Sequence, residues 1–165
     1  MSRGGSSAVA ARSGASGIVA AWLPVVLWMG LITWLSGDRF SDQQTAAWLT
    51  RRSGVALLGL SPDMLEVANV ILRKTAHLVE YAVLGMLIYR ALGGAWRRTP
   101  WARVRWAVGL AASCAMFDEV HQTLTATRTG TPKDVLIDTL GALLGTLLAA
   151  TVVYGRGWWR GTLAP

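Results

Sequence analysis

Residues 18–35 read IVAAWLPVVLWMGLITWL, a run of 18 residues that contains no charged side chain. A transmembrane helix needs about 20 predominantly apolar residues, so this run is a candidate membrane span. A cleaved signal peptide is the alternative, because Arg3 and Arg12 precede the run. The run exceeds a usual signal-peptide core, contains Pro24 and lacks a clear cleavage site. We therefore expect a retained membrane helix.

The composition of the whole chain agrees with a membrane protein. Of its 165 residues, 53% are hydrophobic and 15% are charged, whereas soluble domains carry about 25% charged residues. The net charge of +7 could indicate a nucleic-acid binder. However, the basic residues flank apolar runs, so we expect membrane lipids as partners and no nucleic acid. The single cysteine, Cys114, excludes an intramolecular disulfide framework.

Three more apolar segments follow along the chain. Ser61, Pro62 and Asp63 form a helix start, and the helical pattern then continues to Gly93-Gly94. A third run begins near Val104, and a fourth follows the breakers Gly130 and Pro132. The predicted fold is an all-α integral membrane protein, a four-helix transmembrane bundle with spans at about 18–36, 72–92, 104–122 and 134–154. We also predict a disordered tail at 1–17, an interfacial segment around 41–52 between spans 1 and 2, and a second tail at 156–165.

The charge distribution predicts the orientation. In a four-span arrangement, one side receives both tails and the connection at 93–103. That side carries nine Lys or Arg residues and no acidic residue, and the other side carries the remaining seven together with all nine Asp and Glu. Loops rich in Lys and Arg stay in the cytoplasm. We therefore expect a bacterial cytoplasmic membrane protein with both termini cytoplasmic.

Ionisable residues of three helices should reach one depth, near the outer surface. A helix rises about 1.5 Å per residue, so 20 residues cross about 30 Å of hydrocarbon. Counted from Arg105, the third helix then places Asp118, Glu119 and His121 within the outer third of the membrane. The same count places Lys74 of the second helix and Asp134 of the fourth near the outer surface. We therefore predict one polar pocket that opens outward.

The helical period supports a shared direction for these side chains. Lys74, His77, Glu80 and Tyr81 lie within one arc of about 120°. On the third helix, Asp118 shares a face with residues three and four positions later, namely His121 and Gln122. On the fourth helix, Asp134 and Asp138 share a face with Gly141 and Gly145, a small-xxx-small pair that allows close helix contact. A charged side chain facing lipid costs a few kcal/mol, so these faces should turn inward.

Three segments together resemble the VanZ-like family. They are residues 73–81 (RKTAHLVEY), residues 117–122 (FDEVHQ), and Arg128 followed by residues 133–145 (KDVLIDTLGALLG). The resemblance covers residues 18–155 and departs at Thr127, where a glycine is expected before the loop arginine. It implies a four-span bacterial membrane protein associated with low-level resistance to teicoplanin, a glycopeptide that targets cell-wall precursors. It does not imply a particular biochemical activity.

The predicted site combines possible catalytic and binding groups. His77, Glu80, Asp118 and His121 are the candidate catalytic residues, because a histidine can act as general base beside a carboxylate. The candidate substrate-binding residues are Lys74, Tyr81, Glu119, Gln122, Arg128, Asp134 and Asp138. Hydrogen bonds that only join the helices are the alternative role. No metalloenzyme spacing such as H-E-x-x-H occurs, so we predict no metal, although several of these residues are plausible ligands.

Three functions remain open from the sequence. The pocket binds an anionic envelope lipid such as a lipid-linked cell-wall precursor, with Lys74 and Arg128 on the phosphate. In an enzymatic variant, the protein modifies that lipid. The third alternative is a small proton-coupled carrier or a non-catalytic assembly factor, although four spans without an internal repeat argue mildly against a carrier. The sequence indicates neither a cofactor nor an oligomeric state.

Overall fold

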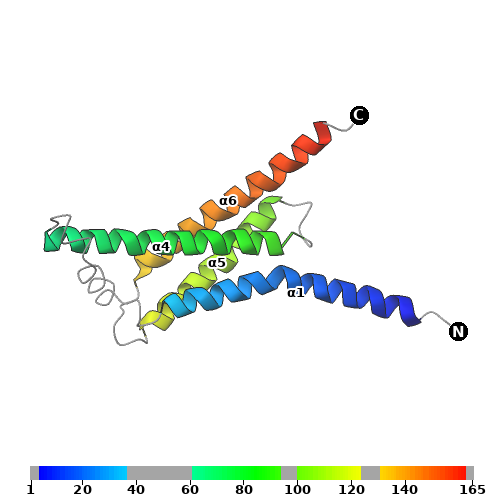
Figure 1. Cartoon of the computed structure of the whole chain (residues 1–165), viewed down its shortest axis with the longest axis horizontal. Coiled ribbons are helices and arrows are strands. Elements are labelled where there is room, and N and C mark those ends of the chain that lie inside the picture. Colours follow the sequence, from blue (N-terminus) through cyan, green and yellow to red (C-terminus); the bar gives the residue numbers. More distant parts are fainter. Residues whose placement is uncertain (1–3, 37–60, 94–99, 124–130, 163–165) are drawn as a thin grey trace.

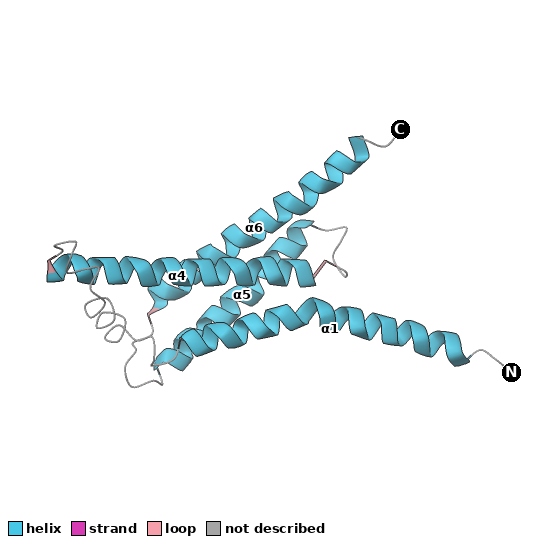
Figure 2. Ribbon diagram, in the orientation of Figure 1, coloured by secondary structure: helices cyan, strands magenta, loops and turns pink. Residues whose placement is uncertain are grey.

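The computed structural model describes the backbone of residues 4–36, 61–93, 100–123 and 131–162. Within these ranges the chain forms four helices and no strand (Figures 1 and 2). The helices are α1 (Gly4–Leu35), α4 (Pro62–Ala91), α5 (Pro100–Thr123) and α6 (Pro132–Thr162). The all-α prediction is confirmed for these ranges. The predicted interfacial segment at 41–52 and Arg128 lie outside the described residues.

Helix α4 begins and ends where the sequence predicted. Ser61 is the N-cap in an extended conformation, and its hydroxyl oxygen accepts a hydrogen bond of 3.4 Å from the Met64 N–H. Asp63 lies in the first turn, where a negative charge favours the positive end of the helix dipole. At the other end, the Leu92 N–H donates to the Ile88 carbonyl at 2.9 Å, and the helix stops before Gly93.

Two helices are longer than the sequence predicted. α1 begins at Gly4, so the structure has helical backbone where we expected a disordered tail. α6 continues to Thr162, past the predicted end of the fourth span near residue 154. Adding a residue to an existing helix is far easier than nucleating one, and alanine is the best helix former. Each apolar run therefore extends its helix through flanking residues that would not form a helix alone.

The most extensive helix interface joins α4 and α6. Gly141 and Gly145 make this contact possible, because an added Cβ would overlap the Leu78 and Ala82 carbonyl oxygens respectively. The predicted small-xxx-small contact is confirmed. The sequence analysis missed Gly85 on α4, where an added Cβ would overlap the Ala142 carbonyl oxygen. Backbones in direct contact fix the register of α4 against α6, and this register aligns the polar side chains described below.

Helix α4 is the centre of the bundle, since it packs against each of the other three helices. α1 attaches to it through polar contacts to backbone carbonyls. The Trp28 indole N–H donates to the Glu80 carbonyl at 2.9 Å, and the Arg90 guanidinium donates to the Ala21 carbonyl at 3.3 Å. Near the same end, the Arg103 guanidinium lies 3.7 Å above the Tyr89 ring and donates to the Tyr89 carbonyl. These contacts hold α1 and α5 beside the C-terminal half of α4.

Two of the four helices are long and apolar enough to cross a membrane by length and composition. These segments are Ser16–Leu35 of α1 and Pro132–Val153 of α6, with mean hydropathies of 2.0 and 1.9. α4 and α5 carry more charge within their lengths, including Arg73, Lys74, Asp118 and Glu119. The chain reverses direction at each connection, so the end of α1, the start of α4, the end of α5 and the start of α6 gather at one end of the bundle (Figure 1). This end carries the predicted polar residues.

Candidate functional site

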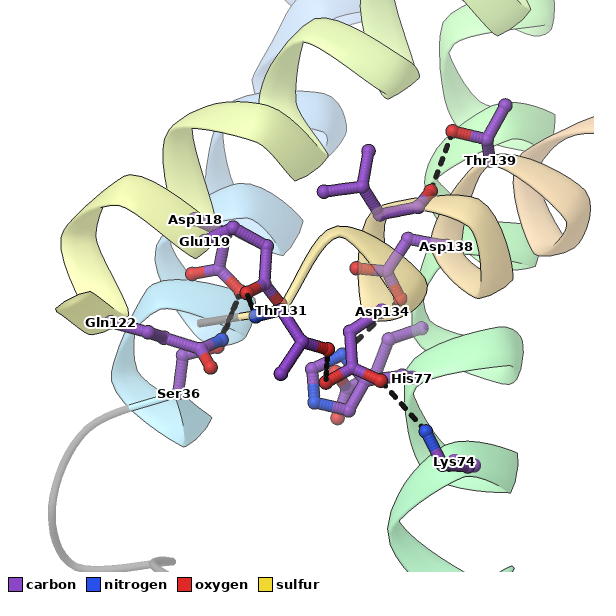
Figure 3. A network of polar contacts seen from close by, with 12 residues as sticks. Ser36, Lys74, His77, Asp118, Glu119, Gln122, Thr131, Asp134, Asp138 and Thr139 are labelled. Carbon is purple, nitrogen blue, oxygen red and sulfur yellow. Dashed lines mark hydrogen bonds and ion pairs between the residues drawn. The ribbon is translucent and has the colours of Figure 1, made fainter. Parts of the chain in front are cut away.

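One ion pair and one histidine–carboxylate contact link α4 to α6. Lys74 Nζ donates to Asp134 Oδ1 at 2.8 Å, and His77 Nδ1 lies 3.2 Å from Asp138 Oδ1 (Figure 3). The Lys74 side chain is 45% exposed, whereas Asp138 is completely buried. The pairs repeat because residues one helical turn apart lie on the same face of each helix. The polar face that the sequence predicted on each of these helices is therefore an interhelical contact.

The Lys74–Asp134 pair is connected to α5 through Thr131 at the start of α6. The Thr131 hydroxyl donates to Asp134 Oδ2 at 3.0 Å, and the Thr131 N–H donates to Glu119 Oε2 at 2.6 Å (Figure 3). Thr131 directly precedes the first residue of α6, so Glu119 places negative charge at the positive end of that helix. A continuous series of polar contacts thus runs from Lys74 through Asp134 and Thr131 to Glu119. Glu119, a predicted substrate-binding residue, therefore contacts the residue that precedes α6.

Asp118 is held by a separate set of hydrogen bonds. Its Oδ2 accepts from the Ser36 hydroxyl at 2.8 Å and from Gln122 Nε2 at 3.0 Å (Figure 3). Ser36 follows the end of α1, so this contact ties α1 to α5 at the polar end of the bundle. Two donors on one oxygen satisfy a carboxylate that is 8% exposed. These hydrogen bonds fix the position of the Asp118 side chain.

Among the described residues, three hollows flank these contacts, and the largest of them, of about 470 Å³, lies between α5 and α6 with Glu119 and Thr131 in its lining. The other two contain the predicted histidines. The first, which we name the α1/α4/α5 groove, has a volume of about 250 Å³ and includes Tyr81, Asp118 and His121 in its lining. The second, the α4/α6 cleft, has a volume of about 40 Å³ and is lined by Val70, Arg73, Lys74, His77 and Asp134. Tyr81 is 1% exposed and interacts electrostatically with both Asp118 and Asp138. It lies one turn after His77 on α4 and lines the groove together with Asp118.

The structure gathers most of the predicted residues at one end of the bundle, but they do not line a single hollow. His77 interacts electrostatically with Asp138, Glu80 and Asp118. Glu80 is half-buried on α4. His121 differs from expectation, since it is exposed and lines the α1/α4/α5 groove, whereas His77 lines the α4/α6 cleft. The two candidate catalytic histidines therefore do not face one hollow.

The sequence analysis missed two partners in this cluster, Ser36 and Thr131. For Thr131 a signal was present, because a threonine three residues before an acidic residue is typical of a helix start. Ser36 has no comparable signal, since its role depends on how α1 approaches α5. In the described part of the chain, no three His, Cys, Asp or Glu side chains converge in a way that could hold a metal ion.

Two buried carboxylate oxygens retain unused hydrogen-bonding capacity. Asp138 Oδ2 and Glu119 Oε1 have no hydrogen-bond partner among the described residues, although Glu119 is only 7% exposed. Leaving a buried polar atom unpaired costs about 1–3 kcal/mol, and more for a charged group. The cluster therefore has acceptors ready for a bound molecule or an ordered water. Together with the Lys74 ammonium and the His77 imidazole, it presents both donors and acceptors.

These features define a class of protein: a small α-helical membrane protein with a charged cluster at one end of its bundle. The family model described as VanZ/LLP1 matches residues 21–153. The chain therefore belongs to the VanZ/LLP1 family, and the resemblance seen in the sequence is confirmed. No curated protein and no solved structure matches the chain significantly.

Proposed function

We propose that this protein crosses the bacterial cytoplasmic membrane four times and binds the phosphate head of an anionic cell-envelope lipid at its outer face. A lipid-linked cell-wall precursor is the lipid class we favour. The observation that carries the proposal is the number of buried ionisable groups at one end of a small bundle. Asp118, Glu119 and Asp138 are all at least nine-tenths buried. Intramembrane ionisable residues are expensive and mark functional sites by default.

The α4/α6 cleft has the charge that a phosphate needs. Three of its five lining residues are basic or can be protonated, namely Arg73, Lys74 and His77, whereas Asp134 is the acidic one. The Lys74–Asp134 pair is partly exposed, and such pairs contribute about 0–1 kcal/mol. Lys74 can therefore exchange Asp134 for a phosphate oxygen at little cost. This exchange would leave Asp134 with the hydroxyl of Thr131.

A family link to teicoplanin resistance fits this proposal, because that glycopeptide targets cell-wall precursors. A protein that holds such a precursor at the outer membrane surface would change its availability. The alternatives of a proton-coupled carrier and a non-catalytic assembly factor predict no saturable lipid binding at the cluster. Lipid binding therefore separates these functions.

A second candidate function, modification of the bound lipid, is favoured by one observation. Asp138 Oδ1 lies 3.2 Å from His77 Nδ1, and a carboxylate at one ring nitrogen orients the imidazole for general-base catalysis by the other. His77 also lines the cleft in which we place the phosphate. Turnover of the lipid that disappears in His77→Gln but not in Lys133→Gln would support this candidate.

The binding proposal is tested by lipid-dependent thermal stability of the full chain in detergent. A ligand that binds only the folded state stabilises it by about 2.7 kcal/mol at a hundredfold excess over Kd. We expect a polyprenyl phosphate, but not phosphatidylcholine, to raise the melting temperature of the wild type. Lys74→Gln should weaken this binding at least tenfold.

Lys133→Gln is the matched control, since Lys133 is exposed on the first turn of α6 and lines none of the three hollows. It should keep the wild-type response. Equal responses in Lys74→Gln and Lys133→Gln, or no response in the wild type, would refute lipid binding at the cluster.

A further inference from the structure

The α1/α4/α5 groove has an apolar part that the binding of a phosphate head does not require. Met29 and Ile32 line it from α1, Leu84 from α4, and Cys114 and Phe117 from α5. The Cys114 Sγ lies 3.8 Å from the Met29 Sδ, so the groove narrows between α1 and α5 at this level. An apolar hollow of this kind favours a hydrocarbon occupant.

On all three helices, the residues that line the groove change from polar to apolar in the same direction. On α5 the order is His121, Asp118, Phe117 and Cys114, which covers about 10 Å at about 1.5 Å per residue. On α4, Tyr81 precedes Leu84 on the way into the bundle, and on α1, Thr33 lies outside Met29. The groove is therefore polar at the end that carries the charged cluster and apolar at its inner end. That gradient matches an amphiphile.

The groove is accessible from the side of the bundle. Within the described residues, α1 packs mainly against α4 and shares no extensive interface with α5, although Ser36 and Asp118 connect them at the polar end. Phe117 at the groove edge is 76% exposed, and Thr33 opposite it is also exposed. A molecule within the bilayer can therefore enter between α1 and α5 without crossing the charged end.

The size of the groove selects a slender occupant. A helix with its side chains is about 10–12 Å in diameter, so over a length of about 10 Å it needs several times the available space. The groove offers about 250 Å³. A single hydrocarbon chain fits this volume better than a helix of another protein or of a second copy.

We infer that the α1/α4/α5 groove holds the hydrocarbon chain of the lipid whose head lies at the charged cluster. The hydrocarbon chain of the lipid enters sideways between α1 and α5. Tyr81 separates this hydrocarbon chain from the polar contacts of the lipid head. At the polar end, the His121 imidazole N–H donates to the ester oxygen that joins head and chain, and Asp118 holds Ser36 and Gln122 in place beside it. This inference rests on the proposed lipid-binding function and adds the path that the lipid takes.

Photo-crosslinking in nanodiscs tests the path. The full protein is placed in a bilayer of phosphatidylglycerol and phosphatidylethanolamine that contains a trace of polyprenyl phosphate with a diazirine within the first isoprene units of its hydrocarbon chain. Crosslinks should map to the groove-lining parts of α1 and α5. Thr33→Trp should reduce them at least fivefold, because an indole at this exposed position fills the groove without replacing a buried residue.

Leu27→Trp is the control on the same helix, since Leu27 is 65% exposed and does not line the groove. It should crosslink like the wild type. If the lipid raises the wild-type melting temperature but crosslinks survive Thr33→Trp or join two protein copies, the inferred path is wrong and lipid binding stands. If the wild type shows no lipid-dependent stabilisation, the proposed function fails and the path fails with it.

Discussion

Asp138 depends on its partner more than any other residue we have described in the cluster. Its side chain is completely buried, and among the described residues His77 is its one hydrogen-bonding partner. Breaking a buried pair leaves an uncompensated charge, whereas replacing both partners with apolar residues is often neutral. This asymmetry allows stability and function to be measured separately.

We predict that His77→Ala lowers the free energy of unfolding by about 3 kcal/mol or more, because it strands the Asp138 carboxylate. The double variant His77→Leu/Asp138→Leu should recover most of the folded yield and still fail to bind lipid. Detergent gel filtration and thermal melting measure folded yield and stability, and lipid-dependent stabilisation measures lipid binding. A double variant that binds lipid normally would assign the pair a purely structural role.

Asp118 should separate binding from folding in a different way. Asp118→Asn keeps one oxygen that can accept from Ser36 or Gln122, so we expect a loss of stability of about 1 kcal/mol. Lipid affinity should fall at least tenfold because the new amide N–H cannot accept from Ser36 or Gln122 and disrupts the hydrogen bonds at the polar end of the groove. Asp63→Asn in the exposed first turn of α4 is the control, with intact affinity. Equal lipid affinity in both variants, measured by titration, would remove Asp118 from the site.

The helical period predicted the polar faces of α4 and α6 well and that of α5 less well. Lys74 and His77 meet Asp134 and Asp138 because both helices repeat their polar residues one turn apart. On α5 we expected His121 to be buried with Asp118. α5 also packs against α6, which turns its buried face toward Glu119 and leaves His121 exposed. A single sequence does not specify how a helix rotates between two neighbours.

At the scale of elements, the α4–α6 interface makes the most stringent demand on residue type. Gly85, Gly141 and Gly145 lie where an added Cβ would overlap backbone or side-chain oxygen atoms of the facing helix. A backbone atom cannot move aside as the end of a flexible side chain can. The sequence predicted Gly141 and Gly145 from their spacing of four residues. Gly85 was missed because tyrosines, not small residues, stand four positions before and after it.

We predict that Gly141→Leu and Gly145→Leu each destabilise the protein by about 1–3 kcal/mol or prevent folding, because they force α4 and α6 apart. Gly109→Leu on α5 should be tolerated, since nothing lies within 4 Å of an added Cβ there. Expression level and melting temperature in detergent provide the comparison. Similar melting temperatures for all three variants would contradict the close contact.

The helix ends show where sequence reasoning succeeds. Ser61 and Pro62 marked the start of α4 correctly because capping is a local interaction. The starts and ends of α1 and α6 at Gly4 and Thr162 depend on propagation from a distant apolar run. Composition alone therefore underestimated both helices.

At the scale of the whole molecule, the charge distribution predicts the orientation. We expect both termini in the cytoplasm and the charged cluster outside. In a Cys114→Ala background, a cysteine introduced at Ser53 should react with an impermeant thiol reagent in intact cells. A cysteine at Thr99 should react only after permeabilisation. Labelling of Thr99 but not Ser53 in intact cells would reverse the orientation and place the cluster inside.

Native mass spectrometry of the detergent-purified protein tests most directly whether the charged cluster is a lipid site. We predict that the wild type retains an anionic lipid at one copy per chain. The folded fractions of Lys74→Gln and Asp118→Asn should lose it, and that of Lys133→Gln should keep it. Equal lipid occupancy in all four proteins, or a wild type without lipid, would contradict the account and leave the cluster as a structural network.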